Sequence, residues 1–99
     1  MDFPDEPQRI LWWLLVATRG GNTRIHILNI LKENPENLNK IATSAGINYR
    51  TAEHHIKVLL DNGIIKKEGK GYGCIYFIAD YYCRHFDLIE KIIESSKTK

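Results

Sequence analysis

Two short amphipathic segments on either side of a tight turn constrain the fold of this chain more than any other feature. The first runs from Leu38 to Ala45, and the second runs from Tyr49 to Asn62. Gly46 between them supplies a turn conformation that residues with a side chain resist, and Ile47 can fill the space beneath the turn. Two helices joined by such a turn are typical of a helix-turn-helix, so we expect these segments to pack as one.

Both segments carry apolar residues at the spacing of a single buried helical face. The stripe of the second segment consists of Ala52, His55, Ile56, Leu59 and Leu60. The stripe of the first segment consists of Leu38, Ile41, Ala42 and Ala45. Asn37 and Asn48 precede the two segments, and asparagine is a residue type that caps free helix amides. Asn62-Gly63 gives the second helix a C-terminal stop.

A β-hairpin is expected directly after these helices. Residues 64–68 and 74–79 have the composition of short strands, and the glycine-rich residues 69–73 separate them. A glycine run between two strands is typical of a hairpin tip. A hairpin added to a helix-turn-helix makes a winged helix, which is the architecture that the sequence predicts.

Two more helices are predicted before the helix-turn-helix. The first runs from Pro7 to about Thr18, and it is apolar on every side between Ile10 and Val16, so most of its faces must be covered. The second runs from about Thr23 to Glu33, with Asn22 or Thr23 as its cap. Its inward stripe consists of Ile27, Leu28 and Leu31, flanked by Ile25 and Ile30.

A last helix is expected after the hairpin, with Asp80 as its cap. Its apolar stripe consists of Tyr82, Phe86, Ile89, Ile92 and Ile93. The predicted fold class is mostly α with a small β-hairpin wing (α+β), a winged helix-turn-helix with extra N- and C-terminal helices. We expect a single domain over residues 1–99, comprising an N-terminal helix at 7–18, a winged-helix core at 23–79 and a C-terminal helix at 80–95.

Composition indicates a soluble globular protein of the cytoplasm. Hydrophobic residues make up 43% of the chain and charged residues 26%, a balance typical of folded domains. The longest apolar run, Ile10 to Ala17, is too short for a membrane span, which needs about twenty residues. Acidic residues near the start do not suit a secretory signal. Cys74 and Cys83 form no CxxC pair, so reduced thiols are expected.

The segment from Gly46 to Ile65 resembles the recognition segment of ArsR-type winged-helix regulators. The most specific parts are Thr51-x-x-His54-His55-Ile56-Lys57-Val58-Leu59 and the Asn62-Gly63-Ile64-Ile65 entry to the wing. The Thr18-Arg19-Gly20-Gly21 start and Tyr72-Gly73 in the wing are similar to an archaeal branch of such proteins. The resemblance covers roughly residues 10–90 and implies a homodimer that binds operator DNA and regulates transcription.

One departure from this family concerns metal sensing. Members that sense metals often carry a cysteine pair in the helix before the recognition turn, and residues 38–45 contain no cysteine. Cys83, His85 and Asp87 follow an i, i+2, i+4 spacing that turns the histidine away from the other two side chains. We therefore expect no metal and no cofactor. No nucleophile motif or phosphate-binding glycine loop is present in the sequence, so an enzyme is not expected.

The outward face of the segment from residue 49 supplies the candidate DNA contacts. Arg50 can make a bidentate contact to guanine or a contact to phosphate, and Glu53 can accept from cytosine. Resemblance to the family assigns base reading to His54. The complete set is Asn48, Tyr49, Arg50, Thr51, Glu53, His54 and Lys57 on this segment, with Lys66, Lys67, Lys70 and Tyr72 on the wing.

Several of these residues also have an interpretation that involves no contact with DNA bases. Charge on one helix face usually only solvates a surface, although a helix-turn-helix frame favours the DNA role. Thr51 and Lys57 suit phosphate better than bases. Tyr49 leans inward by helical angle, but the helix start can expose its hydroxyl. His55 lies on the apolar face, so we expect a hydrogen-bonded core histidine and no ligand role.

The terminal helices are the candidate dimer interface, because one small domain cannot easily cover every apolar face of both. The proposed contacts are Trp12, Trp13, Tyr82, Phe86, Ile89 and Ile93, with the last helix outside the minimal core. The predicted function is a sequence-specific regulator of transcription that binds double-stranded DNA as a homodimer, with a palindromic operator. The alternative is a winged helix used for protein contact in a larger transcription or replication assembly.

Overall fold

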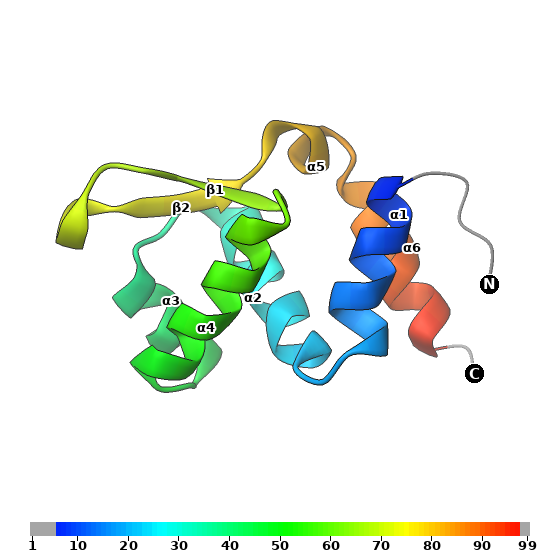
Figure 1. Cartoon of the computed structure of the whole chain (residues 1–99), viewed down its shortest axis with the longest axis horizontal. Helices are drawn as coiled ribbons and strands as arrows, with labels where there is room; N and C mark the ends of the chain where they lie inside the picture. The colour runs from blue at the N-terminus through cyan, green and yellow to red at the C-terminus, as the bar shows by residue number, and fades with distance from the viewer. Residues whose placement is uncertain (1–5, 98–99) are drawn as a thin grey trace.

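The computed structural model describes residues 6–97 of the chain, without the side chains of Tyr72 and Lys97. It is mostly helical with one two-stranded hairpin, as the sequence predicts. Figure 1 shows the hairpin reaching out on one side of the helices, while the first and last helices lie together at the opposite end. The elements in chain order are α1 Glu6–Trp12, η1 Trp13–Ala17, α2 Gly21–Glu33, α3 Leu38–Ala45, α4 Tyr49–Asp61, β1 Ile65–Glu68, η2 Gly71–Gly73, β2 Ile75–Ile78, α5 Asp80–Arg84 and α6 Phe86–Lys97.

The helix-turn-helix of α3 and α4 forms within one residue of its predicted bounds. The side-chain oxygen of Asn37 accepts from the backbone N–H of Lys40 at 2.8 Å, and Asn48 caps Thr51 at the same distance. Gly46 adopts a left-handed conformation with φ of 70°, which is the conformation that favours glycine after a helix. These local contacts fix where each helix starts and how the chain turns between them.

The hairpin is anchored to the helical part by a short backbone bridge. Its strands pair antiparallel, with Ile65 opposite Ile78 and Glu68 opposite Ile75. The backbone of Tyr76 in β2 also exchanges hydrogen bonds of 2.8 and 3.1 Å with Glu36, in the α2–α3 connection. This bridge holds the base of the wing beside the helix-turn-helix.

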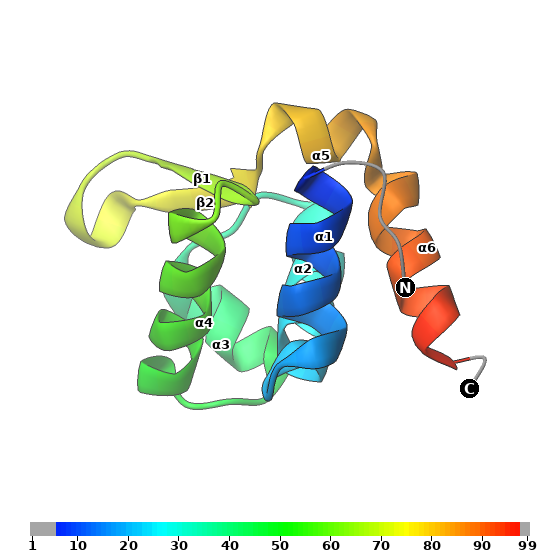
Figure 2. The same ribbon diagram turned by 45° about the vertical axis from the view of Figure 1, so that its right-hand side comes forward.

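A single hydrophobic core joins all of these elements. Figure 2 shows α2 lying behind α1 and between α6 and the helix-turn-helix. The inward stripe expected for α2 is confirmed, because its three residues are at most 4% exposed. The side chains that are almost completely buried are Leu11, Ile27, Leu28, Ile41, Leu59, Ile64, Ile65 and Ile89.

The start of α2 differs from the expected one. The helix begins at Gly21, and the cap position is Gly20 with φ of 92°, so the prediction that Asn22 or Thr23 caps it is wrong. A side chain at either glycine would collide with a neighbour. A Cβ on Gly20 would lie 2.7 Å from Cε1 of His55, and one on Gly21 would overlap the backbone of Leu15. Gly20 therefore lets the α1–α2 connection approach α4, and Gly21 lets the start of α2 approach the backbone of η1.

The N-terminal helix widens into a π-helical turn before it ends. Residues Trp13–Ala17 form η1, and both the backbone N–H and the hydroxyl of Thr18 donate to the carbonyl of Trp13. Such turns are rare and leave main-chain carbonyls in need of other partners. The carbonyl of Leu14 obtains its partner from the side chain of Arg24 in α2.

The segment 80–95, expected as one helix, is two helices with a break at His85. α5 crosses beyond the base of the hairpin, and α6 then runs beside α1 (Figure 1). Asp80 is the first residue of α5, where Ala79 takes the cap position, and its carboxylate pairs with Arg84 at 3.1 Å. No glycine or proline lies at the break, and beyond it α6 packs against α1.

The stripe of the last segment belongs to the core, which corrects the expectation that it lies outside. Tyr82 and Phe86 are 6% and 8% exposed, and Ile89 is fully buried within one chain. They pack in the same cluster as the apolar residues of α1, α2 and α4. Burying these side chains stabilises the single domain, because each removes a large apolar surface from water.

Replacing Ile89 by glutamate should therefore unfold the domain and not simply separate a dimer. An unpaired carboxylate at this fully buried position costs about 3–5 kcal/mol, a large share of the stability of a small domain. Ile89→Val is the matched control, with an expected cost of about 1 kcal/mol. Urea denaturation followed by circular dichroism measures both, and a stably folded Ile89→Glu chain would contradict the burial.

Candidate nucleic-acid interface

The outward face of α4 collects most of the predicted contact residues. Arg50, Glu53, His54 and Lys57 are all exposed on this helix. The opposite face, with Ala52, His55, Ile56 and Leu59, is buried in the domain. Because the helix is fixed from behind, its polar side chains project into solvent as one surface, which we call the recognition face.

The first turn of α4 contributes differently. Tyr49 is 46% exposed, so its side chain lies at the surface of the domain and not in the core. The side-chain oxygen of Asn48 accepts from the Thr51 backbone N–H, while its amide hydrogens can donate to another partner. Thr51 is half-buried. Asn48 thus serves first to fix the start of the helix.

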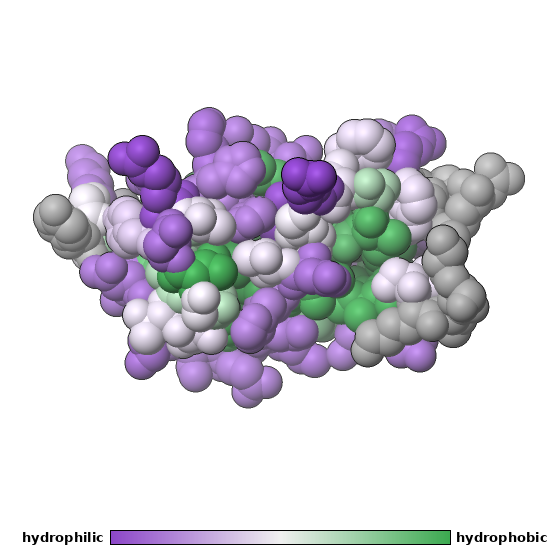
Figure 3. Space-filling model, turned by 90° about the horizontal axis from the view of Figure 1, so that it is seen from below, coloured by the Kyte–Doolittle hydropathy of each residue, from purple (hydrophilic) through white to green (hydrophobic). Residues whose placement is uncertain are grey.

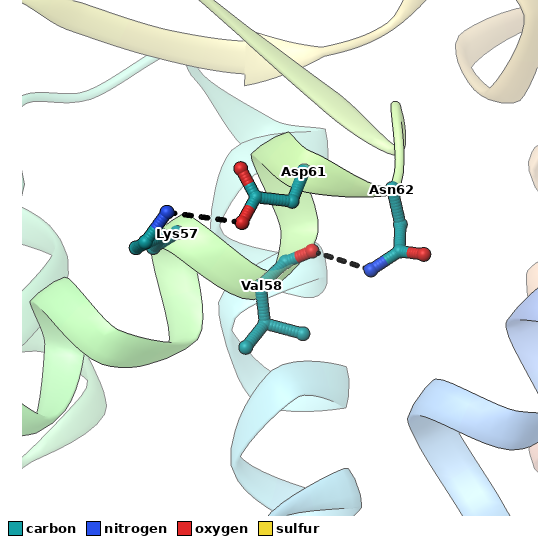
Figure 4. Close-up of polar contacts among 4 residues, drawn as sticks. All are labelled: Lys57, Val58, Asp61 and Asn62. Atoms are coloured by element: carbon teal, nitrogen blue, oxygen red, sulfur yellow. Dashed lines mark hydrogen bonds and ion pairs between the residues drawn. The ribbon is translucent and has the colours of Figure 1, made fainter.

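Lys57 forms an ion pair with Asp61 one helical turn later. Figure 4 shows this contact, in which Nζ lies 3.1 Å from a carboxylate oxygen, next to the bond from the Asn62 side chain to the Val58 carbonyl. Both members of the ion pair are largely exposed. Exposed pairs of this kind contribute about 0.2–1 kcal/mol, so Lys57 can exchange its carboxylate for another anion at little cost.

The hairpin separates the two adjacent wing lysines onto opposite faces. Lys67 lies across from Tyr76, and Lys66 lies across from Phe77. Directly paired residues share a face of an antiparallel ladder, and successive residues alternate. The Tyr76 face looks toward the start of α4, whereas Phe77 lines a hollow with Pro35 on the other side. Only Lys67 therefore shares the face turned to the recognition helix.

A cavity of about 330 Å³ lies between the wing and the two helices of the helix-turn-helix. Its lining consists of Asn37, Leu38, Asn39, Tyr49, Gly71, Cys74 and Tyr76. Burial, followed by the neighbouring Cys74, raises the pKa of Tyr76 to about 12, so its phenol stays a neutral hydrogen-bond donor. The sequence analysis missed Tyr76, although strand alternation places it on the face of Lys67.

A buried polar cluster lies behind the recognition face. Arg24 is 4% exposed, and its guanidinium donates to the carbonyls of Leu14 at 2.9 Å and Arg19 at 3.2 Å, and to the Thr18 hydroxyl at 2.7 Å. Its NH1 lies 3.1 Å from Nδ1 of His55, which confirms the expected hydrogen-bonded core histidine. We call these residues the Arg24 cluster.

The protonation state of His55 follows from this environment. Its pKa is lowered first by burial, then by the positive charge of Arg24 and then by that of His54. The neutral form, with Nδ1 free to accept, is the one that suits the contact with the guanidinium. Arg24 itself was missed by the sequence analysis, although it continues the inward stripe of Ile27, Leu28 and Leu31 by one helical turn.

The remaining predicted positions show no built site. Lys66, Lys67 and Lys70 are exposed, while the Tyr72 side chain lies outside the described residues. Among the described residues, no cluster of three histidine, cysteine or carboxylate side chains is arranged to hold a metal ion. Cys74 is buried and Cys83 exposed, both as free thiols. No helix within residues 6–97 is long and apolar enough to span a membrane.

The fold is similar to several solved structures of low sequence identity. One is the homodimeric winged helix-turn-helix DNA-binding domain of a possible ArsR-family transcriptional regulator from Mycobacterium bovis. It shares 24% identity with a TM-score of 0.70, covering 90% of this chain and 81% of that chain. Reduced HlyU from Vibrio cholerae shares 13% identity with a TM-score of 0.66, covering 93% and 92%.

An archaeal structure has the same architecture. A possible transcriptional regulator from Methanosarcina mazei shares 16% identity with a TM-score of 0.57, covering 96% of this chain and 85% of that chain. No curated protein matches the sequence at a significant level. The sequence model of the winged helix-turn-helix family, in contrast, matches residues 23–75, which is more than half of the chain. The match begins within α2 and ends at the start of β2, and the chain belongs to the winged helix-turn-helix family.

Proposed function

We propose that this protein is a sequence-specific regulator of transcription that binds double-stranded DNA as a homodimer. The observation that carries the proposal is the recognition face of α4, where Arg50 and His54 project from a helix whose other side is buried. A recognition helix enters the major groove with its N-terminal residues at the base edges. Both side chains lie within the first six residues of α4, where such contacts are made.

The chemistry of the recognition face suits base reading. An arginine fork pairs with two acceptors of guanine, and a carboxylate such as Glu53 accepts from cytosine. His54 can donate or accept, depending on its protonation state. Thr51 and Lys57 are assigned to phosphates, because exchange of the exposed Lys57–Asp61 pair for a phosphate costs little.

The wing is assigned to the DNA backbone. Lys67 is on the hairpin face turned toward α4, and Lys70 is at the exposed tip. Lysines at such positions contribute affinity that does not depend on sequence and that weakens as salt rises. Lys66 points to the other face, so its contribution should be smaller.

The dimer contacts are assigned to the outer side of the terminal helices. Trp13 is 59% exposed, and Trp12 and Ile93 are only partly buried. Figure 3, seen from below, shows one apolar patch at the end of the molecule that holds α1 and α6 and a second patch over the helix-turn-helix. The related Mycobacterium bovis domain is described as homodimeric. Tyr82, Phe86 and Ile89 would support this interface from within the core, because they are buried in one chain.

Two-fold symmetry would set the form of the operator. A symmetric pair of winged helices presents two copies of α4 to one side of the duplex. Half-sites are then read about 34 Å apart, which is one turn of B-form DNA. The proposal therefore includes a palindromic operator, which selection of bound duplexes from a random-sequence pool would identify.

Arg50→Ala and His54→Ala should each weaken binding to the selected operator by about 1–3 kcal/mol. The loss should be smaller on a scrambled duplex, because the removed contacts read bases. Lys91→Ala, an exposed basic residue on α6, is the control and should leave both affinities unchanged. Equal losses on operator and scrambled DNA would overturn the reading role. No DNA binding by the wild-type chain would favour a protein-contact domain.

Lys67→Ala and Lys70→Ala should each lower affinity on every DNA sequence. Each should also flatten the plot of log affinity against log salt by about one unit, because one phosphate contact is lost. Lys66→Ala, on the opposite face of the hairpin, is the matched control and should leave the slope nearly unchanged. Fluorescence anisotropy over a salt series measures these slopes, and identical slopes for all three variants would exclude the assignment of faces.

Trp13→Glu should convert the dimer to a folded monomer. The side chain is exposed in the single chain, so the charge disrupts an interface without entering the core. Sedimentation should give twice the chain mass of 11.5 kDa for the wild type at micromolar concentration and the single-chain mass for the variant. Tyr81→Glu, another exposed aromatic position, is the control expected to stay dimeric. A monomeric wild type would disprove the dimer.

A further inference from the structure

We propose that Arg24 is a positioning residue that locks the orientation of the recognition helix to the α1–α2 connection through His55. The inference rests on the proposed DNA-binding function and extends it to a residue that lies outside the recognition face. It concerns the Arg24 cluster, which joins three parts of the fold at one buried guanidinium.

The first argument is the number of partners. The guanidinium donates to Leu14 at the end of the N-terminal arm, to Thr18 and Arg19 in the connection, and to His55 in α4. Within the described residues, no buried side-chain nitrogen or oxygen lacks a hydrogen-bond partner. Moving α4 would break one of these bonds and leave a buried donor unsatisfied, which is costly.

The second argument is that only arginine fits this role. Its planar fork carries five donors in fixed directions, whereas lysine carries one ammonium group that cannot reach acceptors on three sides. The space is also closed, because a Cβ on Gly20 would lie 3.2 Å from NH1 of Arg24 and 2.7 Å from Cε1 of His55. The cluster therefore has one arrangement.

The third argument is the place of His55 on α4. It is adjacent to His54, and the two rings lie 5.2 Å apart, edge to face. His55 also lies five residues after Arg50 on the same helix. A rotation of α4 that separates Nδ1 from the guanidinium would therefore displace both proposed base-reading side chains.

Protonation of His55 gives a direct way to open the cluster. A proton on Nδ1 removes the acceptor and places a second positive charge beside the guanidinium. The charged or titratable groups around the ring are Arg24 from α2 and His54 from α4, with the connection contributing the Arg19 backbone and the Thr18 hydroxyl. No carboxylate is among the groups that shift its pKa.

The sign of the pH effect follows from this environment. The pKa of His55 is lowered in the folded protein, so the neutral form is favoured there. The stabilisation is complete above the ordinary histidine pKa of about 6.5 and is lost as the pH falls below it toward the folded value.

The experiment uses the full chain and the operator duplex from random-pool selection, with Arg24→Lys, His55→Leu, their double variant and His55→Asn. Asparagine keeps an acceptor at the position of Nδ1 and does not titrate. Arg24→Lys and His55→Leu should each weaken operator binding about tenfold, as expected for loss of a hydrogen bond to a charged group. The double variant should bind no more weakly than the weaker of the two single variants, because both substitutions break the same Arg24–His55 contact.

His55→Asn should retain operator affinity within about twofold at pH 7.5. As the pH falls from 7.5 to 5.5, the operator affinity of His55→Asn should rise relative to that of the wild type, because only the wild type loses its contact with the Arg24 guanidinium. His26→Gln, an exposed histidine on the same helix as Arg24, is the matched control and should follow the wild-type pH profile. Additive losses in the double variant, or a wild-type profile in His55→Asn, would overturn the proposal.

A readout without DNA separates this inference from the proposed function. Hydrogen exchange of the α4 backbone amides should be faster in Arg24→Lys than in the wild type. When the pH is lowered to 5.5, exchange should speed up more in the wild type than in His55→Asn, after correction for the intrinsic pH dependence. If the wild-type chain binds no DNA but these differences appear, the positioning role stands and the DNA function fails. If Arg24→Lys does not fold, the comparison of wild type with His55→Asn still decides the matter.

Discussion

The burial of one guanidinium at the centre of the molecule is the interaction on which the arrangement of the remaining elements depends. The Leu14 carbonyl in the π-helical turn accepts from Arg24, Gly21 brings the start of α2 against that turn, and Gly20 brings the connection against His55 of α4. A buried polar group without a partner is costly, so this close approach needs a donor. Arg24 supplies it and also donates to His55, so its guanidinium links the N-terminal arm, α2 and α4.

Burial of one side of α4 explains how so small a domain can present a defined polar face. The recognition face has the core behind it, the Asn48 cap at its start and the wing at its side. Binding through Arg50 then has to order only its side chain, because its backbone is already fixed in the helix. The bridge between Glu36 and Tyr76 extends the same support to the hairpin, so the wing is held beside the helix-turn-helix.

The helix-turn-helix could be predicted closely because its determinants are local. Two asparagine caps, one glycine in a left-handed turn and the spacing of apolar residues act within a few positions of each other. The exposed face of α4 follows from the same periodicity, which is why Arg50, Glu53, His54 and Lys57 were all placed correctly on the outside. Arg24 and Tyr76 were missed because their roles depend on partners far along the chain.

The sequence by itself determined the order of the elements, the two asparagine caps of the helix-turn-helix and the polar face of the recognition helix, since each depends on neighbouring residues. Only the tertiary structure decided the break at His85, the burial of Ile89 and the division of Lys66 and Lys67 between two faces. An apolar stripe such as that of the last helix looks the same in a sequence whether it meets its own core or a second chain. Packing of α6 against α1 makes that choice, because it removes the stripe from water within one chain.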